Sequence, residues 1–209
     1  SILIGCSGCG GYVNDEVCRA SDVVLLHGNT LSRSQLYNLI LKAREYTPEK
    51  PIVINEDSQA IGQLAVCEEL ACSWGYYNNM TKQEPPTYWE ITKGEDEYFA
   101  WRMAQMLGIR QDEIPIEEQY YLQGFEPHMH HKGIRFPRVA ALYPESIDMV
   151  RFYHNGKHIY TCYDESFTCN FISNWDQKGV QTQNGDRFVA EIVLRSGELK
   201  KLEATVNNQ

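Results

Sequence analysis

Asp22-Val-Val-Leu-Leu-His27 is the stretch that decides the fold class of the first part of the chain. Such an uninterrupted apolar run is typical of a strand buried on both faces of a parallel sheet. It ends at Gly28-Asn29, and Ser32-Arg-Ser-Gln35 then has the pattern of a capping box, which begins a helix. Apolar residues at helical spacing follow, namely Leu36, Leu39, Ile40 and Ala43. The stretch therefore predicts one strand–helix unit.

Three further strand–helix units are expected around this one. Their predicted strands are short apolar runs: Ile2–Ile4, Pro51–Ile54 and Ala71–Trp74. Their predicted helices are residues 14–20 with Asn14 as N-cap, residues 60–70, and a helix with Phe99, Met103, Met106 and Leu107 on one face that ends at Gly108. Four alternating strands and helices within residues 1–107 predict a parallel sheet with right-handed crossovers.

The chain changes character after residue 107. Residues 108–133 lack periodicity and contain Pro115, Gly124 and Pro127, so they are expected to link two domains. Residues 134–209 contain short alternating segments, predicted as the strands 138–143, 148–154, 157–163, 167–172, 187–195 and 199–206. The second and third of these segments meet at Asn155-Gly156, a dipeptide typical of a tight hairpin turn. Regular short strands without helices predict a β-sandwich for this part.

Charge and hydropathy exclude two classes of partner. The net charge is −9, and residues 1–125 hold nine of the 19 Lys and Arg but eighteen of the 28 Asp and Glu. Nucleic-acid binding requires a cationic face that displaces counterions from phosphates, and no basic run supplies one. A membrane helix needs about 18 or more consecutive apolar residues, and the sequence contains no such run. Neither nucleic acid nor a membrane is therefore expected as a partner.

The seven cysteines do not form an evident disulfide framework, because their number is odd and they are scattered along the chain. Cys6-Ser-Gly-Cys9 has the spacing of a metal-binding or redox pair. No second such pair follows it, and a glycine run follows where a redox motif would begin a helix. Ordinary buried thiols are therefore expected, with neither a metal site nor a cofactor.

The candidate site lies at the carboxyl ends of the predicted parallel strands, where ligands bind in α/β sheets. It consists of Glu56 as the catalytic carboxylate, with His27, Asn29, Asn55, Asp57, Trp74 and Tyr76 as substrate-binding residues. Glu56 precedes the helix cap and could act as nucleophile or base. Asp57 could instead cap the next helix, and His27 could be a satisfied polar group at the rim. Trp74 and Tyr76 could belong to the core or could stack on sugar rings.

The order of these strand ends resembles a known family. His27-Gly28-Asn29, Lys50-Pro-Ile-Val-Ile-Asn-Glu56-Asp57 and Ser73-Trp-Gly-Tyr76 look like the last four βα units of a (β/α)8 glycoside-hydrolase barrel. They are most similar to bacterial members of the cellulase-like superfamily. Residues 134–209 resemble a bacterial Ig-like module through Val150–Gly156 and Trp175. The resemblance implies half of a TIM barrel over residues 1–107, with Glu56 at the position of the nucleophile and Trp74 at the sugar site.

The sequence departs from that family in its acid/base residue. The family's acid/base Glu, usually preceded by Asn, ends the fourth barrel strand, whereas the resemblance here begins at the fifth. Glycosidases need two carboxyl groups about 5–9.5 Å apart across the glycosidic bond, and the neighbours Glu56 and Asp57 would point to opposite faces of a strand. The resulting expectation is a glycoside hydrolase-like protein that binds poly- or oligosaccharides. It would be inactive alone, as a fragment of a secreted or periplasmic parent.

Two other functions stay open. The chain could be a noncatalytic carbohydrate-binding or adhesion protein that uses the aromatic residues of the site. It could also be a metal-dependent hydrolase that uses His128, His130 and His131, although histidines in a linker are as easily part of a solvated loop. The open edge of half a barrel would need covering, so pairing with a second copy, as a homo-oligomer, also stays open.

Overall fold

The computed structural model describes residues 2–58, 60–75, 93–109, 118–127, 129–173 and 176–207, and only the backbone of 171–173 and 176–177. The chain divides into two compact units, Ser1–Asn79 (unit 1) and Met80–Gln209 (unit 2). None of the described helices has both the length and the apolar composition needed to span a membrane.

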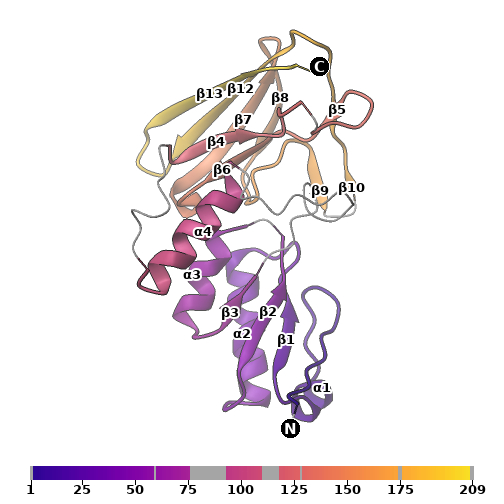
Figure 1. The fold of residues 1–209 in the computed structure, drawn as a ribbon, viewed down its shortest axis with the longest axis vertical. Helices are drawn as coiled ribbons and strands as arrows, with labels where there is room; N and C mark the ends of the chain where they lie inside the picture. The colour runs from indigo at the N-terminus through magenta and orange to yellow at the C-terminus, as the bar shows by residue number, and fades with distance from the viewer. Residues whose placement is uncertain are drawn as a thin grey trace. The chain divides into compact units, whose positions relative to one another are not determined.

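Unit 1 contains a small parallel sheet with helices in the connections (Figure 1). Its elements are α1 (Asp15–Ala20), β1 (Val24–His27), α2 (Arg33–Tyr46), β2 (Ile52–Glu56), α3 (Gly62–Glu69) and β3 (Ser73–Trp74). The strand order is β1-β2-β3, and both pairs are parallel. Helix α2 packs against both α1 and α3. The central strand β2 therefore has a partner on each side, and its carboxyl end lies between the ends of its neighbours.

Local sequence patterns account for much of unit 1. Asn14 caps α1 by accepting from the Val17 amide at 3.0 Å. The capping box of Ser32 and Gln35 begins α2 as predicted. The predicted apolar stripe of α2 is buried, namely Leu36, Leu39, Ile40 and Ala43. These three predictions are confirmed because each depends on contacts within a few residues.

The prediction of four βα units is wrong, because the described part of unit 1 contains three strands. Ile2–Ile4, the predicted first strand, forms no strand. Ile4 makes hydrogen bonds with Asp22, and a single bridge joins Ser7 to Leu25. The side chains of Ile2, Leu3 and Ile4 are 88%, 69% and 67% exposed, so the burial that would stabilise an apolar edge strand is missing.

Unit 2 is mainly antiparallel (Figure 1). It begins with α4 (Glu95–Met106), β4 (Tyr120–Gln123), β5 (Ile134–Arg135), β6 (Arg138–Ala141) and a short 3-10 helix (Pro144–Ser146). It continues with β7 (Ile147–His154), β8 (Lys157–Cys162), β9 (Phe171–Ser173), β10 (Asp176–Gln177), β11 (Val180–Gln181), β12 (Arg187–Leu194) and β13 (Leu199–Thr205). Its main sheet has the order β13-β12-β7-β8, and β4-β6, β5-β11 and β9-β10 pair separately.

The main sheet of unit 2 buries one face. Phe188, Ala190 and Ile192 alternate with more exposed residues along β12 and join the core. The hairpin between β7 and β8 turns at Asn155-Gly156 as predicted, with φ of 50° and 78°. Both values are positive, as a two-residue turn of this kind requires. The predicted strands β7, β8, β12 and β13 and the predicted turn are therefore confirmed, and the predicted alternation is clear in β12 and β13.

The prediction of an Ig-like β-sandwich for residues 134–209 is wrong for two reasons. The segment 167–172, predicted as a strand, begins with turns in which Phe167 and Asn170 have φ of 43° and 57°, and β9 begins only at Phe171. In addition, β6 pairs with β4, which comes from the expected linker 108–133. Unit 2 therefore has one four-stranded sheet and three short two-stranded pairings among its described residues.

Helix α4 lies in unit 2 and contacts β6, whereas the sequence assigned it to the first domain. Its buried face also differs from the predicted stripe. Met106 and Leu107 are 39% and 68% exposed, whereas Tyr98 and Arg102 are buried. Arg102 donates to the Leu142 carbonyl at 3.4 Å and contacts Glu145. These polar contacts select the buried face of the helix, and a search for apolar periodicity cannot detect them.

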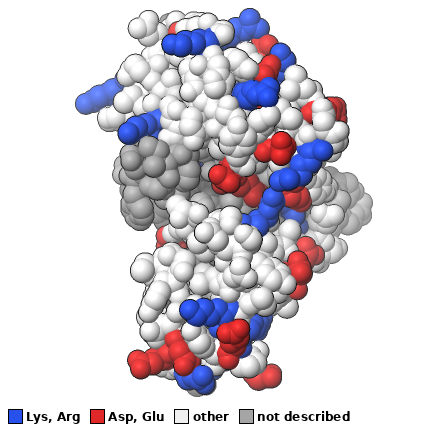
Figure 2. Space-filling model, turned by 180° about the vertical axis from the view of Figure 1, so that it is seen from behind, with Lys and Arg blue, Asp and Glu red and all other residues white. Residues whose placement is uncertain are grey.

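Charges of both signs are interspersed on the surface shown in Figure 2. Among the described residues on that face, Lys and Arg side chains lie next to Asp and Glu side chains, and no broad area carries a single sign. The main sheet of unit 2 carries ion pairs of this kind, including Lys201 with Glu191 at 2.8 Å. The acidic excess of the sequence does not form a continuous patch on this face.

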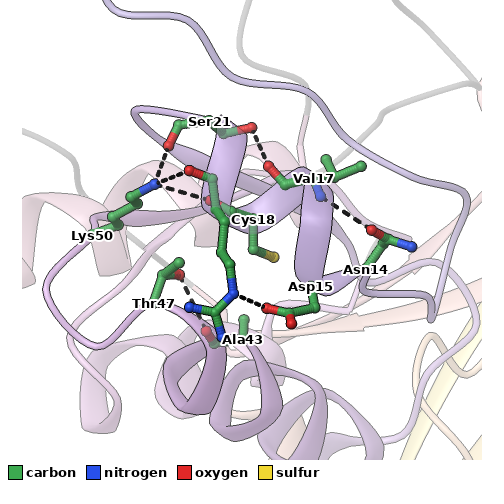
Figure 3. Close-up of polar contacts among 9 residues, drawn as sticks. Asn14, Asp15, Val17, Cys18, Ser21, Ala43, Thr47 and Lys50 are labelled. Atoms are coloured by element: carbon green, nitrogen blue, oxygen red, sulfur yellow. Dashed lines mark hydrogen bonds and ion pairs between the residues drawn. The ribbon is translucent and has the colours of Figure 1, made fainter.

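Lys50 ties helix α1 to the segment that leads into β2 (Figure 3). Its ammonium donates to the carbonyl oxygens of Cys18, Arg19 and Ser21 at 3.1, 2.7 and 2.7 Å. The last carbonyls of a helix lack partners within the helix and carry partial negative charge. A cation satisfies both needs, so Lys50 ends α1 and fixes its place in unit 1.

Candidate functional site

The candidate site lies at the carboxyl ends of β1 and β2. The two strands pair in parallel from Val24 with Ile52 onward, and His27 pairs with Glu56. The register shifts between Leu26 and His27, so that Asn55 is an extra residue on β2. A bulge of this kind redirects side chains at the end of a strand. It brings the side chains that follow the two apolar strands to one edge of the sheet.

Glu56 accepts a hydrogen bond from Asn29 at this edge. The distance from Asn29 Nδ2 to Glu56 Oε1 is 2.7 Å. The second carboxylate oxygen of Glu56 lies 3.9 Å from His27 Nε2, and the side chains of His27 and Glu56 are 18% and 33% exposed. The amide therefore orients one oxygen of Glu56, while the carboxylate as a whole stays accessible to solvent.

Asn55 completes this group, which we call the Glu56 cluster (His27, Asn29, Asn55 and Glu56). Its Nδ2 lies 3.5 Å from His27 Nε2, and the residue is exposed. The cluster presents an acidic acceptor, an imidazole and two amides along one edge. Side-chain amides can donate hydrogen bonds to hydroxyl groups and accept them, and a carboxylate can accept them, so the cluster can bind a polyhydroxylated ligand.

Asp57 has a different environment from its neighbour Glu56. Asp57 is 0% exposed. Its Oδ2 accepts from Trp74 Nε1 at 2.7 Å, and its Oδ1 accepts from the Ser58 amide at 2.7 Å. Gly28 lies against the same carboxylate, because a Cβ added at Gly28 would come within 2.4 Å of Oδ2. Asp57 thus links β1, β2 and β3 inside unit 1.

The structure brings together four of the seven predicted site residues in the Glu56 cluster. Asp57 and Trp74 lie inside the unit, bonded to each other, and Trp74 is 6% exposed. Tyr76 lies outside the described residues. Sequence reasoning missed Gly28 as a supporting residue. The signal was a glycine directly after a buried strand, which often marks a close approach of backbone to another group.

A second carboxylate, Glu95 at the start of α4, is buried in unit 2. Its Oε2 lies 2.5 Å from Arg138 Nη2, and the two side chains are 5% and 4% exposed. Arg138 also donates to Gln123 Oε1 at 3.3 Å. Burial raises the pKa of Glu95 from 4.5 to about 8, and the charge of Arg138 opposes that rise. The pair joins α4 to the β4-β6 pairing.

The described residues contain no group of three or more His, Cys, Asp and Glu side chains placed to hold a metal ion. Among the histidines of the metal hypothesis, His128 lies outside the described residues. His130 Nδ1 accepts from the Gly133 amide at 3.2 Å within a turn, and His131 forms a bridge with Ile134. In the described part of this segment, His130 and His131 therefore take part in turns.

Comparisons with known proteins found similarity to solved structures but no matching sequences. No family model matches the chain, and no curated protein matches it. Among solved structures, the chain is similar to a glycosyl hydrolase family 2 member from Bacteroides cellulosilyticus, with 8% identity, a TM-score of 0.44, and coverage of 98% of this chain and 28% of that one. A β-glucuronidase from Bacteroides uniformis has 10% identity, a TM-score of 0.39, and coverage of 92% and 26%.

A putative β-galactosidase from Bacteroides fragilis has 11% identity, a TM-score of 0.36, and coverage of 96% and 35%. The chain therefore spans about a quarter to a third of the length of these proteins. The structural neighbours are glycoside hydrolases of family 2 at low identity. They do not specifically support the half of a cellulase-superfamily barrel that the sequence suggested.

Proposed function

We propose that the Glu56 cluster binds a carbohydrate, as part of a glycoside hydrolase-related protein. The observation that carries the proposal is the carboxylate of Glu56, which is 33% exposed and is held at 2.7 Å by the neutral amide of Asn29. A neutral donor orients the carboxylate through one oxygen and leaves room for further hydrogen bonds to it. Sugar hydroxyls can then donate to it, while the amides of Asn29 and Asn55 supply further polar contacts.

Glu56 is the accessible carboxylate of the cluster, and a glycosidase would need a second carboxyl group about 5–9.5 Å away across the glycosidic bond. Asp57, the nearest carboxylate in sequence, is buried and accepts from Trp74 and Ser58. It therefore cannot reach a glycosidic oxygen. General acid catalysis contributes about 10²–10⁴-fold to such reactions. We therefore propose that this chain by itself binds sugar but does not hydrolyse unactivated glycosides.

Binding is tested by NMR titration of the isotope-labelled chain with a panel of mono- and oligosaccharides. β-Glucuronides and β-galactosides are the first probes, since the neighbours' names refer to those sugars. We expect amide shifts confined to residues 27–29 and 55–57. Glu56→Gln, which keeps the size and removes the charge, should weaken binding, whereas Glu45→Gln on the exposed face of α2 should not. Equal binding by wild type and Glu56→Gln would overturn the proposal.

Catalysis is tested with two substrates that differ in leaving group. The dinitrophenolate group of a dinitrophenyl glycoside leaves without protonation, so a nucleophilic Glu56 would take up the glycosyl group and release dinitrophenolate in a burst that Glu56→Gln abolishes. The matching methyl glycoside requires a proton donor and should remain intact. Steady turnover of the methyl glycoside would overturn the proposal that this chain by itself does not hydrolyse unactivated glycosides. Sugar binding without any burst would support the noncatalytic alternative.

A further inference from the structure

Helix α3 ends in a Schellman motif that brings two cysteines together. The Cys72 amide donates to the Cys67 carbonyl at 2.9 Å, and the Ala71 amide donates to the Glu68 carbonyl at 3.2 Å. Ala71 has a φ of 51°, the left-handed conformation that this motif requires after the helix. The motif places the side chain of the first residue against that of the sixth. In this chain both positions are cysteine.

The two thiols are in direct contact. The thiol of Cys72 donates to the carbonyl oxygen of Cys67 at 3.6 Å, and each thiol is the largest influence on the pKa of the other. Cys67 is buried, whereas Cys72 is half-buried. Small reagents from solution can therefore reach Cys72 first, and Cys67 is positioned directly behind it.

The charges around the pair distinguish the two sulfurs. The hydrogen bond from Cys67 lowers the pKa of Cys72, and the positive charge of Arg44 lowers it further, against the effect of burial. Arg44 is held at this turn because its Nη2 donates to the carbonyls of Leu70 and Ala71 at 3.2 and 3.0 Å. The same hydrogen bond raises the pKa of Cys67, as do its burial and the nearby thiol of Cys72. Cys72 is therefore the more readily ionised of the two thiols.

We propose that Cys67 and Cys72 form a redox-active dithiol. Hydrogen peroxide oxidises Cys72, and Cys67 then converts the product into a disulfide.

In the first step the Cys72 thiolate attacks one peroxide oxygen. The O–O bond breaks, and the other oxygen leaves as hydroxide, which takes up a proton to form water. Cys72 becomes a sulfenic acid. In the second step the Cys67 sulfur attacks the Cys72 sulfur, and the S–O bond breaks. The Cys67 proton and the departing hydroxide form a second water molecule.

The other cysteines of unit 1 provide internal comparisons. Cys6 and Cys9 are exposed, and Cys18 is buried. Burial and the negative charge of Asp15 raise the pKa of Cys18. Exposure alone would therefore favour oxidation of Cys6 and Cys9, and burial alone would protect Cys67 as well as Cys18. Oxidation of Cys67 together with Cys72, but not of Cys18, is a pattern that only a contacting pair produces.

The experiment uses the full chain in a Cys6→Ser, Cys9→Ser background, treated with increasing hydrogen peroxide and analysed by differential alkylation and peptide mass spectrometry. The tryptic peptide 45–82 contains Cys67 and Cys72 as its only cysteines. We expect this peptide to lose two hydrogens while Cys18 remains alkylatable, and dithiothreitol to reverse the loss. In Cys72→Ser, loss of the free Cys67 thiol should be at least about tenfold slower. In Cys67→Ala, dimedone should trap Cys72 as the sulfenic acid.

Three results would overturn the proposal. The first is oxidation of Cys18 at the same peroxide concentration as peptide 45–82. The second is an unchanged rate of Cys67 loss in Cys72→Ser. The third is a failure of dimedone to label Cys72 in Cys67→Ala, provided that circular dichroism shows this variant to be folded. Should Cys67→Ala not fold, Cys67→Ser replaces it with a side chain closer in size and polarity to cysteine.

Discussion

Glu56 in unit 1 and Glu95 in unit 2 are both glutamates held by a nitrogen donor, but their environments are opposite. Glu56 accepts from the neutral amide of Asn29 and is 33% exposed. Glu95 is buried and is paired with the cation Arg138. The difference shows that burial and accessibility, rather than the type of side chain, separate a structural carboxylate from a candidate for binding. The carboxylate with the strongly raised pKa is a structural link, and the accessible one is the candidate for binding.

The comparison also shows what each arrangement costs. An accessible carboxylate keeps much of its hydration, so its orientation by Asn29 requires little stabilisation elsewhere. A buried ion pair has lost the hydration of both charges, and its mutual attraction only partly compensates. Removal of one partner then leaves an uncompensated buried charge. Variants of the two glutamates and their partners should therefore differ most in the free energy of unfolding.

The largest effect is expected for Arg138→Met. Where Glu95 is ionised, at about pH 8 and above, loss of the cation leaves its charge buried without a partner, which costs about 3–5 kcal/mol of the free energy of unfolding. Without Arg138 the pKa of Glu95 rises further, so the loss should be greater at pH 8 than at pH 5. Urea unfolding of unit 2 at both pH values measures this loss.

Arg19→Met is the control, because the Arg19–Asp15 pair on α1 is exposed and should contribute little. Similar losses in the two variants would contradict the assignment of Arg138 as a buried structural cation.

Glu95→Gln should change the pH dependence of stability. Burial raises the pKa of Glu95 to about 8 in the folded chain, above its ordinary value of 4.5. Between these pH values the unfolded chain releases the proton that the folded chain retains. The free energy of unfolding should therefore be highest below about pH 4.5 and fall as pH rises to about 8. Gln cannot ionise, so the variant should lose this part of the decrease in the free energy of unfolding with rising pH. If the free energy of unfolding had the same pH dependence in wild type and in the variant, the raised pKa of Glu95 in the folded chain would be contradicted.

Asp57→Ala is expected to have an intermediate effect. Asp57 is buried like Glu95, but the described hydrogen bonds to it come from the uncharged donors of Trp74 and Ser58. The substitution leaves those donors without their acceptor, which costs about 1–3 kcal/mol. Unfolding in urea, followed by the fluorescence of unit 1, measures the loss.

Gly28→Ala tests the same contact from the other side. It should also destabilise unit 1, since its Cβ would come within 2.4 Å of the Asp57 carboxylate. The loss in the double variant should be smaller than the sum of the two single losses, because Asp57→Ala removes the carboxylate that the added Cβ would meet. Additive losses would contradict contact between Gly28 and Asp57.

The sequence predicted the parts of the molecule that depend on local patterns. The capping box at Ser32, the hairpin turn at Asn155 and the cluster at the ends of β1 and β2 follow from residues close together in the chain or from general rules for parallel sheets. The pairing of Glu95 with Arg138 could not be predicted, because it joins a helix to a distant strand through polar atoms. For the same reason the predicted buried face of α4 was wrong. An apolar stripe was expected where polar contacts determine the orientation.

The smallest change in stability is expected for Glu56→Gln, the counterpart of Glu95→Gln in unit 1. Gln keeps the size of the side chain and retains an oxygen that accepts from Asn29. The carboxylate is 33% exposed, so the variant removes neither a buried charge nor a core contact. The free energy of unfolding should change by less than about 0.5 kcal/mol, and sugar binding should nevertheless be weakened. A thermal or urea unfolding curve that coincides with wild type would separate a role in binding from one in folding. If Glu56→Gln destabilised unit 1 as much as Asp57→Ala, Glu56 would be a structural residue, and the contrast between the two glutamates would fail.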